Sequence, residues 1–555
     1  MKKILFPLLA GLCMFTACMK DFDEQNTDPY AFKPEYKKAD LANIGGYITQ
    51  MEKSIYFNAN NADWDFQIAQ NLCADVWSGF MAPPTPFAGG QHNGNYAIQF
   101  GWTNFAFGMY NTGIMAPWKK VQEQTVNAED GAEFPEVYAL SLILKVIGMQ
   151  RSTDCYGPIP YSHFGEGGTS VEYDSQSSIY HQFFKELDEA EKLINGFLSS
   201  DRKDANVMKK WDLIFKGDYK KWLKVINSQR LRLAIRISKV EPGLARTEAE
   251  KAMSSPAGVI TTKSENMTLP TETMKHPLCI LAYAYNDIRM SGDMQSILEG
   301  LKDPRLPIYF NPAGDIKGAP EYKGKYLGIR QGIDYPSKGQ RENFSNLGNA
   351  WTMDNMNRTP IVLLGSSEVY FLRAEGALRG WSMGGTPEEL YKKGIEESLS
   401  YWGLSGADYI NDGVSKPIAY VDPTAHKYDM EPASTVTVKW DEGASKEEKL
   451  EKIITQKWIA LFPEGQEAWS EFRRTGYPRL FPMTVNLSQE ISSTIMIRRM
   501  RFETNESERN KAGYEKGVQA LIQESKGAFK TKGDNEGTQL WWDTNAGAAA
   551  GASNF

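Results

Sequence analysis

The sequence is poor in the residues that build metal sites and disulfide frameworks. Its 555 residues include only five cysteines and five histidines. No two cysteines have CxxC spacing, and the histidines lie far apart along the chain. Because zinc sites and disulfide frameworks need such residues at short or paired intervals, we expect no metal, no cofactor and no disulfide framework. We interpret Cys73, Cys155 and Cys279 as buried free thiols.

Common catalytic motifs are also scarce. The chain contains no HExxH and no GxGxxG pattern. The segment GAPEYKGKY at residues 318–326 does not form a phosphate-binding loop, because five residues separate its glycines and a tyrosine follows the lysine. The paired carboxylates of glycoside hydrolases leave no sequence motif, since their separation is set in space. We therefore predict a protein that is not an enzyme, with a glycan-cleaving enzyme as the less favoured alternative.

The charge balance argues against one large class of partners. The formal net charge is −7, and the chain has no basic block. Nucleic-acid binding relies on clustered lysine and arginine, so we expect no nucleic-acid partner. Beyond the first 15 residues, no segment is apolar enough to span a membrane, which takes roughly 20 apolar residues.

The first 17 residues are typical of a secretory signal peptide. Two lysines precede an apolar stretch at residues 4–15, which is too short to cross a bilayer. Thr16 and Ala17 then precede Cys18 as in the lipobox of bacterial lipoproteins, although Phe15 stands where leucine is usual. We predict cleavage before Cys18 and acylation of its thiol and amine, which gives a stable anchor. The alternative is an ordinary signal peptide cleaved elsewhere.

Residues 18–35 are expected to form a flexible tether. The sequence MKDFDEQNTDP, which follows Cys18, is polar and acidic. Such a segment buries too little apolar surface to offset its chain entropy. The acidic run resembles the signal that exports lipoproteins to the outer surface of Gram-negative gut bacteria, or it is a plain solvated linker.

Helical patterns dominate the rest of the chain. Apolar residues recur at helical spacing over residues 136–151 and 178–197, and Asp218 is placed to cap a third helix. A helical hairpin is predicted from Ser367 to Leu399, with a Gly-Gly turn and a capping box that begins at Thr386. This hairpin resembles a tetratricopeptide repeat, although no strict 34-residue period recurs.

Long segments rich in glycine, proline, asparagine and aromatic residues separate the helices. Loops of this length are uncommon in compact domains unless they are functional. We expect them to cluster over a helical scaffold. They cover residues 81–104, 255–275, 311–350 and 403–440.

Four features together resemble the SusD/RagB family of nutrient-binding outer-membrane lipoproteins. They are the lipobox with its acidic tether, DPRLPIYF at 303–310, GSSEVYFLRAEGALRGW at 365–381 and TQKWIALFPEGQEAWSEFRRTGYPRL at 455–480. The resemblance implies a mostly α-helical single domain over residues 36–545, with four tetratricopeptide-like helix pairs packed against a loop-rich irregular half. It also implies a lipid anchor in the outer membrane, surface exposure and a SusC-like TonB-dependent transporter as partner.

The last of these motifs also has a purely physical interpretation. Its apolar residues have helical spacing, and two arginines with a Gly-Tyr-Pro turn end the segment. We favour structural packing over ligand contact for this motif. The residues concerned are Trp458, Leu461, Phe462, Trp469 and Phe472.

Candidate ligand contacts come from the aromatic loops. Sugars present flat C–H faces and hydroxyl edges, so a saccharide site needs exposed aromatic rings beside polar side chains. Three stretches offer this combination, and no family motif specifies their residues. The candidates are Trp64, Asp65, His92, Tyr96, Tyr283, Asn286, Arg289 and Trp351, whereas Trp77 and Trp102 are interpreted as core or loop anchors.

Within this resemblance, the abundance of aromatic residues favours an oligosaccharide as ligand. A peptide ligand, as in RagB-like members, stays open. A helical adaptor that binds no small ligand is a further alternative.

The anchor leads to a direct prediction. Cys18→Ala should release the protein from the outer membrane, because the substitution removes the acylated residue. Cell fractionation followed by immunoblotting measures the distribution. Retention of the variant in the membrane fraction would argue against lipidation at Cys18.

Overall fold

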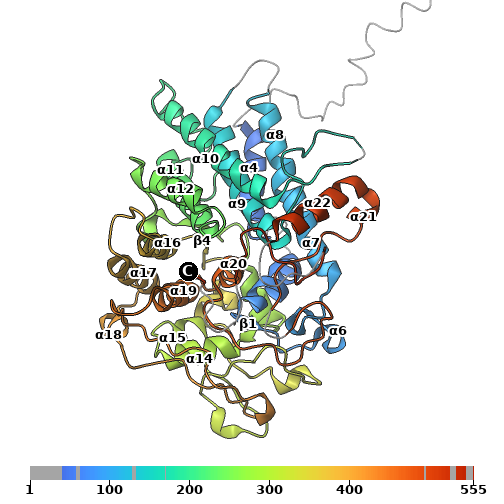
Figure 1. The fold of residues 1–555 in the computed structure, drawn as a ribbon, viewed down its shortest axis with the longest axis vertical. Helices are drawn as coiled ribbons and strands as arrows, with labels where there is room; N and C mark the ends of the chain where they lie inside the picture. Colours follow the sequence, from blue (N-terminus) through green and yellow to red (C-terminus); the bar gives the residue numbers. More distant parts are fainter. Residues whose placement is uncertain are drawn as a thin grey trace, which may run out of the picture.

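A computed structural model describes residues 41–57, 63–127, 133–168, 170–492, 496–525, 533–545 and 554–555. The predicted signal peptide at 1–17, the lipidated Cys18 and the tether at 18–35 lie outside the described residues. The described chain forms one mostly helical unit with a loop-rich lower half (Figure 1).

The helices fall into an N-terminal and a C-terminal group. The first group is α4 (Ala42–Ser54), α5 (Asp63–Phe66), α6 (Phe87–Gly90), α7 (Phe100–Tyr110), α8 (Ala116–Gln124), α9 (Pro135–Tyr156), α10 (Gln176–Leu198), α11 (Tyr219–Arg236) and α12 (Pro242–Ser254). The second is α13 (Pro277–Cys279), α14 (Gly292–Gly300), α15 (Leu306–Tyr309), α16 (Ser366–Leu378), α17 (Pro387–Tyr401), α18 (Ala407–Ile410), α19 (Lys446–Leu461), α20 (Gly465–Thr475), α21 (Glu506–Arg509) and α22 (Lys511–Glu524). Among the described residues, no helix combines the length and the apolar composition needed to cross a membrane.

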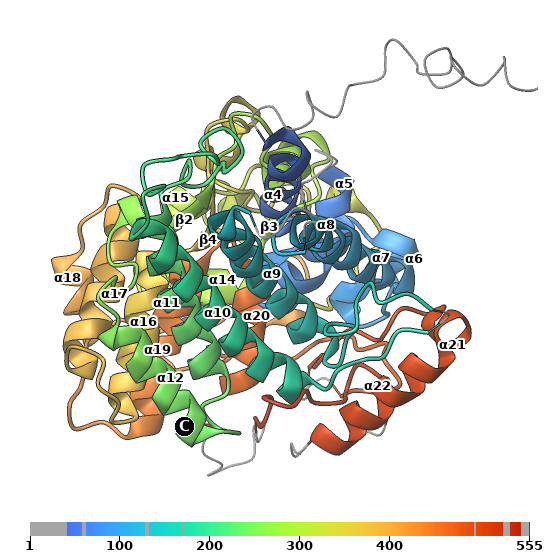
Figure 2. The ribbon, with the colours of Figure 1, turned by 90° about the horizontal axis from the view of Figure 1, so that it is seen from above.

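Neighbouring helices pack as pairs. Helix α4 packs on α8, α9 on α10, α11 on α12, and α16 on α17. Figure 2 shows α9 to α12 and α16 following one another across the molecule, with α5, α6 and α7 on the opposite side. The predicted mostly helical single domain is therefore confirmed. The assignment of the pairs as tetratricopeptide-like repeats stays a prediction.

Strands are short and lie in the loop-rich part of the described chain. Strand β1 (Met81–Ala82) pairs with β3 (Arg289–Met290), and β2 (Met267–Leu269) pairs with β4 (Ile361–Leu364), both antiparallel. Each pair joins loops that are far apart in sequence. The first pair holds the loop after residue 80 against the segment around residue 289, which matters for the site described below.

Local capping explains where several helices begin. The Asp218 carboxylate accepts hydrogen bonds from the backbone N–H groups of residues 220 and 221, as predicted for a helix cap. Thr386 and Glu389 form the predicted capping box at the start of α17. The prediction of Ser367 as the helix cap is wrong by two positions, because Gly365 occupies the cap and α16 begins at Ser366.

The α16–α17 hairpin depends on a small residue at its crossing. A Cβ atom added to Gly394 would lie 2.8 Å from the Phe371 ring, so a larger side chain would separate the helices. The segment GWSMG at 380–384, which matches GxSxG, lies in the turn between these helices. A catalytic GxSxG motif needs a turn from a strand into a helix, so this match is structural.

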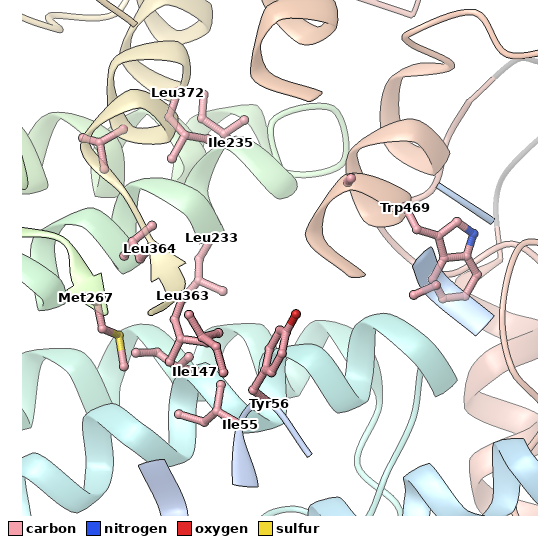
Figure 3. Packing of buried hydrophobic residues seen from close by; sticks show 14 of the residues in the cluster. Ile55, Tyr56, Ile147, Leu233, Ile235, Met267, Leu363, Leu364, Leu372 and Trp469 are labelled. Carbon is pink, nitrogen blue, oxygen red and sulfur yellow. The ribbon is translucent and has the colours of Figure 1, made fainter. Parts of the chain in front are cut away.

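The core is apolar and continuous across the helix pairs. Leu233 of α11, Ile147 of α9 and Tyr56 after α4 belong to one buried cluster that also includes Leu363 of β4 (Figure 3). The three predicted free thiols are confirmed, since Cys73, Cys155 and Cys279 are buried and unpaired with one another.

Charged side chains also lie inside this core, and they connect its helices. Arg236 of α11 contacts Glu467 and Glu471 of α20 at 2.6 Å each. Lys457 of α19 lies 3.1 Å from Glu471, and Arg474 of α20 lies 2.7 Å from it. We call Arg236, Lys457, Glu467, Glu471 and Arg474 the buried charge network. All five are buried.

The network reaches two further helices. Arg474 also contacts Glu375 of α16 at 2.6 Å, and Arg236 lies 3.5 Å from Asp154 of α9. Burial alone raises the pKa of Glu471, but Arg474, Lys457 and Arg236 outweigh burial and hold its pKa well below the usual value. Glu471 is therefore ionised in the folded protein at neutral pH.

The segment at 455–480 is structural, as predicted. Trp458 and Trp469 are fully buried, and the Trp458 indole N–H donates to the Ser78 carbonyl at 2.8 Å. The Trp469 ring lies 4.9 Å from that of Trp77. The segment forms two helices, because α19 ends at Leu461 and α20 begins at Gly465.

We expect Glu471→Gln to lower the free energy of unfolding by about 3–5 kcal/mol, because it removes a carboxylate that compensates the charges of three buried cations, Arg236, Lys457 and Arg474. The loss should be present above pH about 4.3, the value for an unfolded glutamate, and should shrink below it as the carboxylate protonates. Urea denaturation at several pH values measures both effects. Glu396→Gln, which removes an exposed partner of Lys393, is the matched control and should change little. Equal effects of the two substitutions would contradict a stabilising role of the network.

Candidate functional site

Partly exposed aromatic rings form a continuous stripe over α5, α7 and the loop at 86–92. The Trp64 side chain on α5 is 50% exposed, and its ring centroid lies 5.2 Å from that of Phe105 on α7. Trp102 precedes Phe105 by three residues, so both rings project from the same side of α7. Trp102 meets Phe87 edge to face at 6.0 Å. We call Trp64, Phe105, Trp102 and Phe87 the aromatic stripe.

The stripe ends at a cavity beside His92. The Phe87 ring lies 6.5 Å from the His92 ring, which lines the cavity. The cavity has a volume of about 190 Å³ and includes Pro86, Ile333 and Leu487 in its walls. Its size and mixed lining suit a small organic group.

Local backbone geometry fixes the position of His92. The His92 side chain caps the short 3-10 helix η3 (Asn93–Asn95), and its Nδ1 accepts the Gly94 N–H at 3.1 Å. A Cβ atom at Gly94 would lie 2.8 Å from the imidazole, so only glycine fits there. Burial lowers the pKa of His92 to about 4. The imidazole is therefore neutral at physiological pH, with its proton on Nε2.

A polar cluster borders the stripe around Asp287. Lys338 donates to the Asp287 carboxylate at 2.9 Å, and Gln67 donates to it at 3.3 Å. The Thr85 hydroxyl also donates to this carboxylate. These bonds tie the loop after β1 to the segment at 285–289. Tyr285 in that segment is an exposed ring, at 39%.

Several predicted site residues stabilise the loops instead of facing solvent. Arg289 is buried and donates to the Asn286 side chain at 2.7 Å and, through Nε, to the Glu342 carbonyl at 2.9 Å. Burial lowers the pKa of Arg289 to about 10. The Tyr283 hydroxyl donates to the Leu347 carbonyl and accepts from Asn311 at 2.9 Å. These groups hold the loops that carry the site.

Three other predicted contacts are buried in this structure. Trp351 is 1% exposed and packs its ring against those of Phe462, at 5.4 Å, and Trp402, at 5.6 Å. Tyr96 and Asp65 are buried as well. The expectation that Trp351 offers an exposed platform is thus corrected: its loop folds inward because its ring fills an aromatic pocket beside α15.

The structure places Trp64 and His92 at opposite ends of the aromatic stripe and adds residues that the sequence did not identify. Phe105 completes the stripe, and the spacing of Trp102 and Phe105 on a helical segment was the signal available in the sequence. Ile333 and Leu487 reach the cavity from distant loops, and no sequence pattern connects them. Within the described residues, no group of three or more histidine, cysteine and acidic side chains is arranged to hold a metal ion.

Comparison with known proteins identifies similar chains over nearly the full length. The family model described as SusD-like, SusD and RagB outer membrane lipoprotein, matches residues 24–543. No curated protein matches the chain significantly.

Solved structures with the same fold include a chitin-binding SusD homolog from Flavobacterium johnsoniae. It is 40% identical, covers 92% of this chain and 100% of its own, and has a TM-score of 0.83. A SusD homolog from Bacteroides vulgatus is 34% identical, with 94% and 100% coverage and a TM-score of 0.83. A third, from Bacteroides thetaiotaomicron, is 31% identical, with 91% and 99% coverage and a TM-score of 0.80.

The different placement of two tryptophans can be tested directly. Trp351→Ala should lower the free energy of unfolding by about 3–5 kcal/mol, because it leaves a cavity in an aromatic core. Trp64→Ala should change the free energy of unfolding much less, since half of that side chain is already in solvent. Guanidinium denaturation of both variants provides the comparison. A stable Trp351→Ala variant would contradict the buried position of this ring.

Proposed function

Because this chain belongs to the SusD and RagB family of outer membrane lipoproteins, we propose that it binds oligosaccharides at the aromatic stripe and delivers them to a SusC-like TonB-dependent transporter. The family consists of nutrient-binding proteins without catalytic activity. The chain is accordingly a binding lipoprotein of the outer membrane and not an enzyme. The sugar class and the transporter are the parts that we propose.

The aromatic stripe is the observation that carries the proposal. Its rings come from three separate segments. Trp64 lies 5.2 Å from Phe105, Trp102 lies 6.0 Å from Phe87, and Phe87 lies 6.5 Å from His92. Successive sugar units present apolar C–H faces at regular intervals, and aromatic rings complement such faces. The polar cluster around Asp287 lies beside the stripe and offers hydrogen-bonding groups for sugar hydroxyls.

Charge and similarity together favour a neutral sugar chain. The Lys338 ammonium pairs with the Asp287 carboxylate, so the cluster beside the stripe presents balanced charge. The relative that shares 40% of its residues with this chain binds chitin according to its description. We therefore propose β-linked oligomers of N-acetylglucosamine as the first ligand class. A peptide ligand is the alternative within the family.

The ligand can be tested by isothermal titration calorimetry with the hexamer of N-acetylglucosamine and with a panel of peptides. We expect Trp64→Ala and Trp102→Ala each to weaken hexamer binding by about 5- to 30-fold, which corresponds to roughly 1–2 kcal/mol for the loss of one stacked ring.

Val414→Ala is the control, because Val414 is 85% exposed and follows α18, at the opposite side of the molecule from α6 (Figure 1). This substitution should leave the affinity unchanged. Unchanged affinity in both tryptophan variants would contradict the assignment of the stripe. Binding of peptides but not of the hexamer would support the alternative.

A further inference from the structure

We propose that the cavity beside His92 encloses the terminal unit of the bound oligosaccharide, so that the protein recognises chain ends and not the interior of a long polysaccharide. This inference rests on the proposed function. It adds a mode of recognition, end-on binding, that the stripe alone does not imply, since an open row of rings accepts any part of a chain.

The size of the cavity fits one sugar ring. Its volume is about 190 Å³, whereas a protein cavity of about 150 Å³ accommodates benzene. A pyranose is also a six-membered ring, so the cavity accepts one sugar ring, whose substituents extend toward the opening. Apolar side chains from three loops form much of the wall: Pro86, Ile333, Val485 and Leu487.

The cavity narrows toward buried residues of the core. A recess of about 10 Å³ shares His92, Asn95 and Gly332 with the cavity and continues toward Val76 and Arg330. This volume holds about one water molecule. A sugar chain cannot pass through the cavity in this direction, because the recess is too small for a sugar unit.

Hydrogen bonds connect the walls of the cavity. The Val485 N–H donates to the Gly332 carbonyl, and the Leu487 N–H donates to the Asn95 carbonyl, each at 2.9 Å. The Tyr335 hydroxyl donates to the Pro83 carbonyl. Three loops that are distant in sequence are thus joined around one space.

Two polar groups suit the hydroxyl groups of a neutral sugar. His92 is 8% exposed, and its Nε2–H has no hydrogen-bond partner among the described residues. The Asp334 side chain is exposed in the cavity lining and pairs with no other described side chain. One donor and one acceptor match a hydroxyl group, which can serve as both. The Asp334 charge also disfavours an acidic terminal unit.

The stripe borders the cavity, because Pro86 and Gly90, which flank Phe87 in the sequence, and His92 all line it. Phe87 contacts His92 on one side and Trp102 on the other. When the terminal unit occupies the cavity, the following units lie over Phe87, Trp102 and then Trp64. The order of these contacts gives the chain a defined direction on the protein surface.

End-blocked ligands test the inference with the native protein. Calorimetry compares the hexamer of N-acetylglucosamine with one form that carries 2-aminobenzamide at the reducing end and one form with a bulky ether on the non-reducing terminal sugar. We expect one block to weaken binding at least tenfold and the other to have little effect. Equal affinity for all three ligands would overturn end-on binding.

A substitution that fills the cavity provides a second measurement. Leu487 is 40% exposed in the cavity lining, so Leu487→Trp can fill the cavity without disturbing the core. We expect this variant to bind the unblocked hexamer at least tenfold more weakly. Val414→Trp is the matched control and should bind normally, and circular dichroism should show that both variants are folded.

The outcomes separate the two proposals. If Trp64→Ala weakens binding while Leu487→Trp does not, the stripe is the binding site and end-on recognition is wrong. If the native protein binds no N-acetylglucosamine oligomer, the proposed ligand class is wrong, and end-on recognition of that class is wrong with it.

Discussion

The fold depends on the buried charge network. Arg236, Lys457 and Arg474 share the carboxylates of Glu467 and Glu471 inside the core, so helices α11, α19 and α20 are held in one relative arrangement. An isolated buried charge is costly, and only complementary partners at close range compensate for its desolvation. A displaced helix would leave such a charge unpaired. The network therefore favours one packing over the many that apolar side chains alone would allow.

This rigid scaffold positions loops that lack regular structure. The loop at 81–104 is attached to the helical part through the Trp77 indole N–H, which donates to the Asn93 carbonyl, and to the loop-rich part through β1 and the bond from Thr85 to Asp287. The aromatic stripe lies where these attachments end. Its rings are thus pre-positioned before a ligand arrives, which reduces the entropy lost on binding. The buried charge network stabilises the scaffold, whereas the aromatic stripe is proposed to contact the ligand. The loops join the scaffold to the stripe.

Sequence patterns predicted most accurately the features that depend on residues close together in the chain. The caps at Asp218 and Thr386 depend on side chains within three residues of the backbone groups they satisfy, so they could be recognised in the sequence. The exposure of a tryptophan side chain, in contrast, depends on residues that are distant in the sequence. Trp64 and Trp351 both stand among polar residues, yet one ring is half exposed and the other is enclosed by Phe462 and Trp402. The residues that enclose Trp351 lie more than 50 positions away, which explains why the prediction for Trp351 was wrong.

The sequence by itself determined the helical class, the helix caps at Asp218 and Thr386, the free cysteines and the likeness to a family of binding lipoproteins, because each of these follows from neighbouring residues or from contiguous motifs. The tertiary structure alone decided which aromatic rings form the stripe and where a cavity opens beside His92. Ile333 and Leu487 meet at that cavity across more than 150 residues. Such a meeting is a consequence of how the whole chain packs, and no local pattern encodes it.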